Sequence, residues 1–195
     1  MNIVFVKFGT KYTFEHVNKM IEQLEPYLKG KFWCYTDDPV GVNCECIPPI
    51  RKPKLQKWWN KLALFSNTMP FEGDCVLFDL DLVVKGDPTP FLSWETRPKL
   101  VQSYHKVGNP IYDSPLALDT YYNSSVLTWK AGTSDYVWRY FLCNHDYYTR
   151  KYKGIDRFFR WENINVGVLK HGILSNIENP IEAPILSYEG FEYVV

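Results

Sequence analysis

The spacing of apolar residues in the first part of the chain predicts a strand, a helix and a second strand. Residues 2–8 form a β-branched and aromatic run that ends at Gly9, which is typical of a buried strand. After Thr13, a candidate helix cap, apolar side chains recur at three- and four-residue steps as far as Leu28. The next strand is expected at residues 32–35. Strand, helix and strand in this order predict a parallel crossover unit and an α/β fold.

Apolar runs and helical stripes continue along the rest of the chain. The stripe over residues 55–65 contains Trp58 and Trp59, which core packing explains better than ligand binding. The apolar run at residues 75–78 predicts a strand inside a parallel sheet that is covered on both faces. Further elements are expected as strands at 100–105, 121–129 and 185–188, a helix over about 135–152 and a short helical segment near Asp156.

Length and composition favour a single globular domain over residues 1–195. The 22 basic residues balance 22 acidic ones, so no net field draws in a polyanion and nucleic acid is not expected as a partner. The five cysteines are odd in number and lack zinc-pair spacing, which indicates a reducing compartment. No apolar run approaches about 18 residues and no signal peptide is apparent. We therefore expect a cytoplasmic protein without a transmembrane segment.

Two aspartates, Asp79 and Asp81, interrupt the apolar run at residues 76–84. Alternate side chains of a strand point the same way, so two carboxylates are expected to share a pocket at the strand's carboxyl end. Ligands bind at this edge of open α/β sheets. Neighbouring anions repel unless a proton or cation relieves them, and Mg²⁺ or Mn²⁺ suits carboxylate oxygens. Acids also solvate many strand ends, so this motif alone leaves both interpretations open.

The segment "VLFDLDLVV" resembles the first motif of the haloacid-dehalogenase-like phosphatases, an apolar strand followed by Asp-x-Asp-x-Thr/Val. That resemblance implies Asp79 as a nucleophile and Asp81 as an acid/base. The acidic pair that such enzymes usually carry downstream is not found in this sequence. A whole strand–helix–strand unit also precedes the motif. The resemblance is therefore local.

A second resemblance extends over most of the chain. The sequence is similar to the GT-A glycosyltransferases, and within them to the glycogenin-like, galactosyltransferase-like group (family 8-like). The similar segments are "KFGTKYTF", "YTDD", "WWNKLALF", "CVLFDLDLVVKGDPTPFL", "YYNSSVLTWKAG" and "GIDRFF". Their order makes this resemblance more specific than the Asp-x-Asp motif alone. It implies a Rossmann-like α/β/α sandwich with a mostly parallel sheet, with a nucleotide-sugar half at about 1–90 and an acceptor half at about 91–195.

The resemblance also implies roles for particular residues. Gly9, Thr10 and Tyr12 would contact uracil and ribose, Asp37 would lie near the base, Lys61 would meet the diphosphate, Asp79 and Asp81 would hold the metal, and Asn123 and Asp156 would act at the sugar. Each residue also has a simpler explanation: Lys61 could be solvated, Asn123 could satisfy a strand edge and Asp156 could be a first-turn acid.

The third metal ligand is less well defined, because the C-terminal His-containing stretch of glycogenin-like proteins is absent. His171 in "LKHGIL" is the remaining candidate, with a structural or surface role as the alternative.

The sequence thus predicts a Mn²⁺- or Mg²⁺-dependent glycosyltransferase. It would use a nucleotide-sugar donor, with a UDP-hexose expected, and transfer the sugar with retention to a glycan or other hydroxyl acceptor. The alternatives are the phosphatase described above and a catalytically degenerate module that binds a nucleotide or glycan. Homo-oligomerisation is left open.

Overall fold

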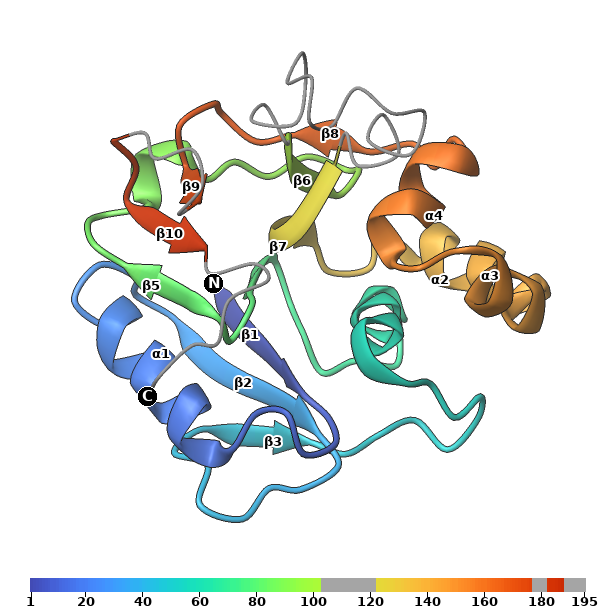
Figure 1. Cartoon of the computed structure of the whole chain (residues 1–195), viewed down its shortest axis with the longest axis horizontal. Helices are drawn as coiled ribbons and strands as arrows, with labels where there is room; N and C mark the ends of the chain where they lie inside the picture. The colour runs from blue at the N-terminus through green and yellow to red at the C-terminus, as the bar shows by residue number, and fades with distance from the viewer. Residues whose placement is uncertain (103–121, 177–181, 188–195) are drawn as a thin grey trace.

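The chain begins with the predicted strand–helix–strand unit. The computed structural model describes residues 1–102, 122–176 and 182–187. β1 (Asn2–Lys7) leads through α1 (Phe14–Leu24) to β2 (Lys31–Thr36), and the two strands pair in parallel (Figure 1). Thr13 precedes the helix, and its backbone N–H donates to Nδ1 of His16 at 3.2 Å. The start of the predicted helix is therefore confirmed, and its end lies before Leu28.

Within the described residues, seven strands make the central sheet, in the order β3-β2-β1-β4-β7-β6-β8. The strands not yet introduced are β3 (Glu45–Ile47), β4 (Asp74–Phe78), β6 (Lys99–Gln102), β7 (Tyr122–Lys130) and β8 (Gly167–Val168). β3, β2, β1 and β4 are parallel, whereas β7 is antiparallel to both of its neighbours, β4 and β6. The predicted α/β fold with a mostly parallel sheet is confirmed.

Different elements cover the two faces of this sheet (Figure 1). On one face lie α1 and a small sheet of β5 (Leu82–Val84), β10 (Ile185–Ser187) and β9 (Leu174–Asn176). On the other lie the 3-10 helix η1 (Lys57–Phe65), α2 (Asp135–Cys143), α3 (His145–Lys151) and α4 (Ile155–Trp161). A short 3-10 turn, η2 (Thr89–Phe91), follows β5.

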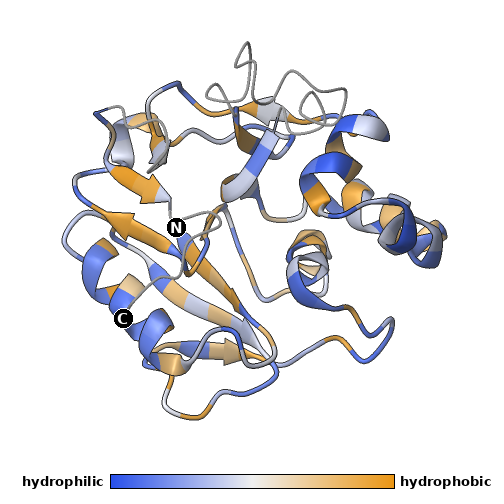
Figure 2. Ribbon diagram, viewed as in Figure 1, coloured by the Kyte–Doolittle hydropathy of each residue, from blue (hydrophilic) through white to orange (hydrophobic). Residues whose placement is uncertain are grey.

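Successive residues of the central strands pack into two separate hydrophobic cores. Val4 belongs to the core under η1 and the C-terminal helices, whereas Ile3 and Phe5 belong to the core under α1. In β4, Leu77 belongs to the core under η1 and the C-terminal helices, and Val76 belongs to the core under α1. Because both faces are buried, the strand sequences are continuous apolar runs. Figure 2 shows β5 and β10 in hydrophobic colours, whereas α1 carries both hydrophilic and hydrophobic positions.

Two predicted helices differ from the structure. The helix expected over 55–65 is a 3-10 helix that begins at Lys57. The helix expected over 135–152 is broken at Asn144, whose backbone is not helical and whose carbonyl accepts hydrogen bonds from the N–H groups of Tyr147 and Tyr148. Asparagine often ends a helix because its short polar side chain competes for nearby backbone groups. Residues 103–105, 121 and 188 of the predicted strands lie outside the described residues.

All five cysteines are free thiols. Among the described residues, no helix combines the length and apolar character that crossing a bilayer requires.

Truncating Phe158 tests the core beneath the C-terminal helices. Its side chain is fully buried and its ring contacts those of Trp59, Phe141 and Tyr148. Phe158→Ala should lower the free energy of unfolding, measured by urea denaturation, by about 3–5 kcal/mol. The control Trp161→Ala removes a ring that is 54% exposed, so its effect should be smaller, about 1 kcal/mol or less. Equal effects for the two variants would contradict this assignment of the core.

Candidate active site

The acidic pair lies on a turn at the carboxyl end of β4. The strand ends at Phe78, and the chain turns through Leu80 and Asp81 into β5. The backbone N–H of Asp79 donates to the carbonyl of Ser125 at 2.8 Å, one residue beyond the β4–β7 pairing. The strand pairing thus continues as far as Asp79, and the predicted extended conformation is wrong for Leu80 and Asp81, which form the turn. Both carboxylates nevertheless line the same cavity, because the turn brings them back together.

A cavity of about 600 Å³ lies at the carboxyl ends of β1 and β4, a size that suits a small-molecule ligand. The loop after β1, the first residues of η1, the acidic turn, β7 and the start of α4 all contribute to its walls. Its charged lining consists of four lysines, Lys11, Lys57, Lys61 and Lys153, and three aspartates, Asp79, Asp81 and Asp156. Most of its charged groups come from segments far apart in the sequence.

Lys61 and Asp79 form an ion pair inside this cavity. The Lys61 ammonium lies 2.7 Å from Oδ1 and 2.8 Å from Oδ2 of Asp79, and it also donates to the Ser124 carbonyl at 3.2 Å. Only 9% of the Lys61 side chain and 24% of the Asp79 side chain are exposed. Lys61 is therefore not a solvated helix residue, and its charge is fixed between β4 and β7.

Burial raises the pKa of Asp79 to about 6. The Lys61 charge acts in the opposite direction, whereas the nearby carboxylates of Asp81 and Asp156 raise the pKa further. Several acids in one partly buried cavity thus make the ionised form of Asp79 costly. Additional positive charge in the cavity would favour that form.

Asp81 is held from the opposite side by the loop after β1. The hydroxyl of Tyr12 donates to Oδ2 of Asp81 at 2.8 Å, and the Lys11 ammonium lies 3.7 Å from the same oxygen. Lys11 also donates to the Tyr12 hydroxyl at 2.6 Å. Burial, together with the Asp81 carboxylate, holds the pKa of Tyr12 well above its ordinary value, so Tyr12 remains a hydrogen-bond donor. This loop is consequently tied to the acidic turn.

Gly9 and Asp37 join the loops that follow β1 and β2. The Gly9 N–H lies 3.3 Å and 3.2 Å from the two carboxylate oxygens of Asp37. Gly9 has a φ of 71°, in the left-handed region that favours glycine. Thr10 is exposed next to it, and none of these three residues lines the 600 Å³ cavity. The structure therefore brings Gly9 and Asp37 together beside the cavity rather than in its wall.

Two predicted site residues do not line the cavity. Asn123 is buried on β7, and its Oδ1 accepts a hydrogen bond from the Ser125 N–H at 2.7 Å. This bond agrees with the simpler explanation that Asn123 satisfies a backbone group at a strand edge. Its neighbours Ser124 and Ser125 line the cavity instead. His171 lies in an exposed turn between β8 and β9 and is not a lining residue. No group of three or more His, Cys, Asp or Glu able to hold a metal occurs among the described residues.

Asp156 is the predicted catalytic residue that does reach the cavity. It lies in the first turn of α4, next to Gly154 and Ile155, which also line the cavity. Its carboxylate contributes to the raised pKa of Asp79, so the two acids are electrostatically coupled. The location also agrees with the simpler explanation that Asp156 is an acid in the first turn of a helix. A residue in the first turn can still face a ligand.

Several lining residues were not predicted from the sequence. Trp58 is 40% exposed and lines the cavity, so its assignment to the core is wrong, whereas Trp59 is buried. Lys57 precedes Trp58 and has a φ of 50°, an uncommon conformation for a residue other than glycine. Lys11 stands between the predicted residues Thr10 and Tyr12, so its position in the loop could have signalled its role. Lys153 offered no comparable signal.

Comparison with known proteins identifies the fold. No protein-family model and no curated protein sequence matches this chain. The solved structure of the galactosyltransferase LgtC with donor and acceptor sugar analogs matches 97% of this chain and 87% of its own, with a TM-score of 0.64 and 12% identity. The glycosyltransferase GlyE of Streptococcus pneumoniae matches with a TM-score of 0.66 and 13% identity, over 96% of this chain and 54% of GlyE.

A third similar structure is a glycosyltransferase involved in glycosylation of the major capsid of PBCV-1. It matches 98% of this chain and 95% of its own, with a TM-score of 0.58 and 10% identity. Nearly the whole described architecture is therefore shared with these proteins. The chain has the GT-A glycosyltransferase fold that the sequence resemblance predicted.

The raised pKa of Asp79 predicts a distinctive dependence of stability on pH. A carboxyl group whose pKa rises from 3.8 to about 6 on folding binds its proton more tightly in the folded state. Its contribution to stability is therefore greatest at low pH and is lost as the pH rises through about 6. We expect the free energy of unfolding of Asp79→Asn to increase relative to that of the wild type as the pH rises from about 4 to about 7. The measurement is urea denaturation in the presence of a metal chelator.

Asp87 provides the matched control for this experiment. Its pKa is lowered by hydrogen bonding to Thr89, so the pH-dependent part of its contribution lies below about pH 4, and the stability difference between Asp87→Asn and the wild type should stay nearly constant from about pH 4 to about pH 7. A stability difference between Asp79→Asn and the wild type that does not change with pH would contradict the proposed environment of Asp79.

Proposed function

We propose that this protein is a glycosyltransferase that transfers a sugar from a nucleotide-diphosphate-sugar donor to a hydroxyl acceptor. The observation that carries the proposal is the joint presence of two carboxylates, Asp79 and Asp81, and four lysines in one cavity of a GT-A fold. UDP-hexose is the expected donor, and Mn²⁺ or Mg²⁺ the expected metal. The named similar structures are all glycosyltransferases, and none of them supports the phosphatase alternative.

The lysines suit a leaving diphosphate. When the bond between the sugar and the diphosphate breaks, negative charge builds on the departing oxygens. Fixed positive charge stabilises this state more than the ground state, which lowers the barrier. Lys61 is already held in place by Asp79 and Ser124, so it loses little freedom when it meets a phosphate. Lys57 and Lys153 extend the positive charge along the cavity wall.

The acidic pair suits a divalent cation. Carboxylate oxygens are the ligands that Mn²⁺ and Mg²⁺ prefer, and Asp79 and Asp81 offer them from one turn of the chain. When bound, the ion would supply positive charge to the diphosphate. Lys11, 73% of whose side chain is exposed, is free to leave Asp81 for a phosphate oxygen. Asp79 and Asp81 are the residues assigned to hold the ion, because His171 does not line the cavity.

The loops after β1 and β2 suit the nucleoside. Tyr12 presents a ring beside the acidic turn, and Gly9 and Asp37 form the adjoining rim through their hydrogen bonds. We assign base and ribose contacts to these residues and to Thr10. In this arrangement the nucleoside lies over the rim and the diphosphate reaches the lysines inside.

Asp156 is the residue proposed to act at the sugar. Its carboxylate lines the cavity that holds the acidic pair, where it can face the positive charge that develops on the anomeric carbon. Asn123 instead positions Ser125 through its hydrogen bond to the backbone. Retention of configuration is the expected outcome.

A binding module without activity is the second candidate. One observation favours it: the chain itself neutralises both acids, with Lys61 on Asp79, and with Tyr12 and Lys11 on Asp81. A cavity of this kind could bind a nucleotide or glycan without a metal. Metal dependence and turnover separate the two candidates.

Asp81→Asn should abolish the metal-dependent binding of UDP. UDP at about 100 times its Kd adds about 2.7 kcal/mol to the stability of the folded protein, which corresponds to a Tm increase of about 5–10 °C for a domain of this size. We expect this increase for the wild type only when Mn²⁺ is present. The control Asp87→Asn removes an exposed carboxylate by the same substitution and should retain the increase. An unchanged Tm increase in Asp81→Asn would contradict the assigned site.

Asp156→Asn should separate catalysis from binding. We expect release of UDP from UDP-hexoses, in the presence of candidate acceptors or water, to fall by about 10²- to 10³-fold. The Kd for UDP should change by less than about twofold, because the substitution leaves the lysines and the acidic pair intact. Absence of turnover in the wild type across a panel of donors would support the binding module. Release of phosphate from phosphate esters would support the phosphatase.

A further inference from the structure

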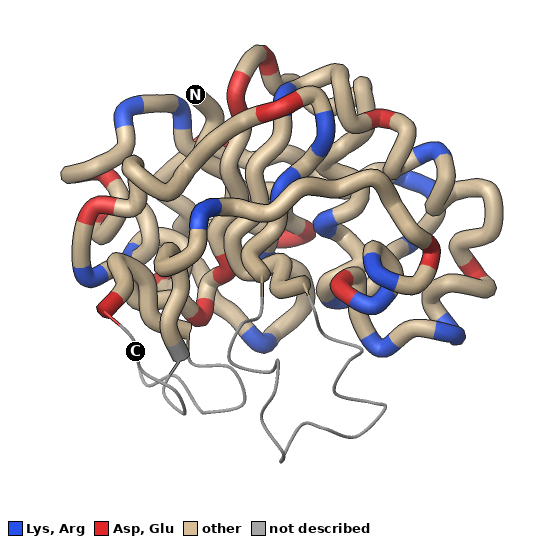
Figure 3. Tube along the Cα trace, turned by 90° about the horizontal axis from the view of Figure 1, so that it is seen from above, with Lys and Arg blue, Asp and Glu red and all other residues tan. Residues whose placement is uncertain are grey.

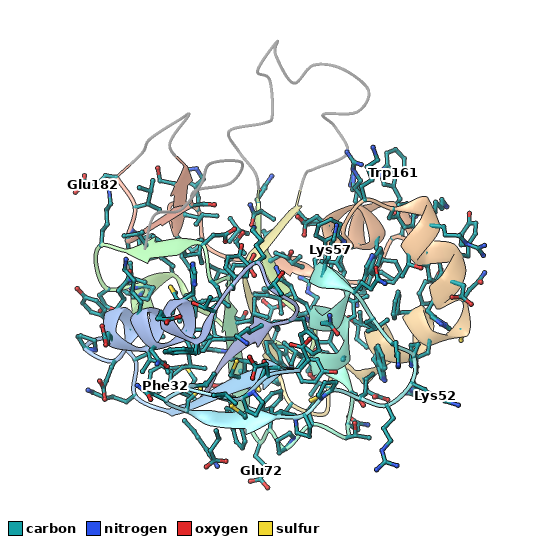
Figure 4. The ribbon with its side chains drawn as sticks, turned by 60° about the horizontal axis from the view of Figure 1, so that its bottom comes forward. Phe32, Lys52, Lys57, Glu72, Trp161 and Glu182 are labelled. Atoms are coloured by element: carbon teal, nitrogen blue, oxygen red, sulfur yellow. The ribbon has the colours of Figure 1, made fainter. Side chains whose placement is uncertain are left out.

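A second, larger groove opens beside the candidate active site. It has a volume of about 950 Å³ and lies between the proline-containing loop before η1, the first residues of η1 and the helix α3. Lys57, Trp58 and Lys153 line both this groove and the active-site cavity. The two spaces are therefore contiguous, and Figure 4 shows Lys57 at the start of η1 and Lys52 on the loop that leads to it.

The groove is strongly basic. Its lining includes Lys52, Lys54, Lys57, Arg150 and Lys153, all of them exposed. Within the described ranges, Asp146 is the single acidic lining residue, and none of these five cations forms an ion pair with a carboxylate. Charge over the chain as a whole sums to zero, and Figure 3 shows acidic and basic residues interspersed along the trace. The basic groove is thus a local feature.

A cluster of like charges is unfavourable unless an anion offsets it. Each of the five cations repels the others, and the groove supplies little acidic charge to compensate. Trp58, at the junction with the active site, also presents a 40% exposed ring, and the Lys57 ammonium lies 5.4 Å from the centre of that ring. Flat rings pack against the apolar faces of sugars. Charge and aromatic surface together suit a chain of acidic sugars.

We propose that this groove binds the acceptor, and that the acceptor is an anionic oligosaccharide. The inference rests on the proposed function, because an acceptor must extend from the cavity in which the sugar is transferred, and the groove begins at that cavity. Carboxylate, sulfate and phosphate groups would all meet the same cations. Nucleic acid is the less favoured polyanion, because the groove opens into the cavity in which a sugar is proposed to be transferred.

The test compares glycans that share a backbone and differ in charge. Binding of dextran, carboxymethyl-dextran and dextran sulfate oligosaccharides of one length is measured by isothermal titration calorimetry on the full chain. The charged oligosaccharides should bind and neutral dextran should not. The two charged probes also distinguish a carboxylate preference from a sulfate or phosphate preference. Binding should weaken with added salt, because the cations are exposed.

The combined variant Lys52→Gln/Lys54→Gln/Arg150→Gln tests the groove itself. None of these residues lines the active-site cavity, so the Kd for UDP should be unchanged. Binding of the charged dextrans should weaken by about tenfold, since each exposed ion pair contributes modestly. The control Lys29→Gln/Lys85→Gln/Lys130→Gln removes the same charge outside the groove, and its binding should stay within about twofold of the wild type.

Three results would overturn the inference. The first is equal binding of neutral and charged dextrans. The second is an equal loss in the groove variant and the control, which would show non-specific attraction of polyanions. The third is tighter binding of a single-stranded oligonucleotide of equal charge. Failure of the proposed function would give a different result. UDP would then not bind to the wild type, whereas the groove variant would still bind charged dextrans more weakly than the wild type does.

Discussion

The ion pair between Lys61 and Asp79 connects the elements on which the candidate site depends. The Lys61 ammonium contacts both carboxylate oxygens of Asp79 and the backbone of Ser124, so it joins η1 to the ends of β4 and β7. Without this charge, three acids in one cavity would favour protonation, because burial alone already raises the pKa of Asp79. The pair thus keeps negative charge available at the end of the sheet.

Burial on both faces of the sheet explains where this pair can form. The residues between the ends of β1 and β4 are apolar, because successive side chains enter the two cores on opposite faces of the sheet. In these two strands the polar side chains lie at the points where the strands begin and end. At the end of β4 the chain turns through Asp79 and Asp81, and at the end of β1 it places Tyr12 against Asp81. The same constraint locates ligand sites at strand ends in other open α/β sheets.

Much of this arrangement could be predicted from the sequence, and the failures have physical causes. The first strand–helix–strand unit could be predicted because the order of apolar residues along a short segment defines each of its elements. The position of the acidic pair could be predicted because it directly follows a long apolar run. The break at Asn144 depends on a single backbone conformation, and the exposure of Trp58 depends on the 3-10 geometry of η1. Whether Asn123 or its neighbour Ser124 faces the cavity depends on how β7 lies against it. The basic groove combines residues from two distant segments, so no local motif indicates it.

A crystal structure of the protein with Mn²⁺ and UDP tests the central claim most directly. We predict anomalous density for manganese between the carboxylates of Asp79 and Asp81, in contact with the diphosphate, with Lys61 beside the phosphate oxygens. UDP bound with manganese elsewhere, while Lys61, Tyr12 and Lys11 still hold the two acids as they do here, would contradict the account.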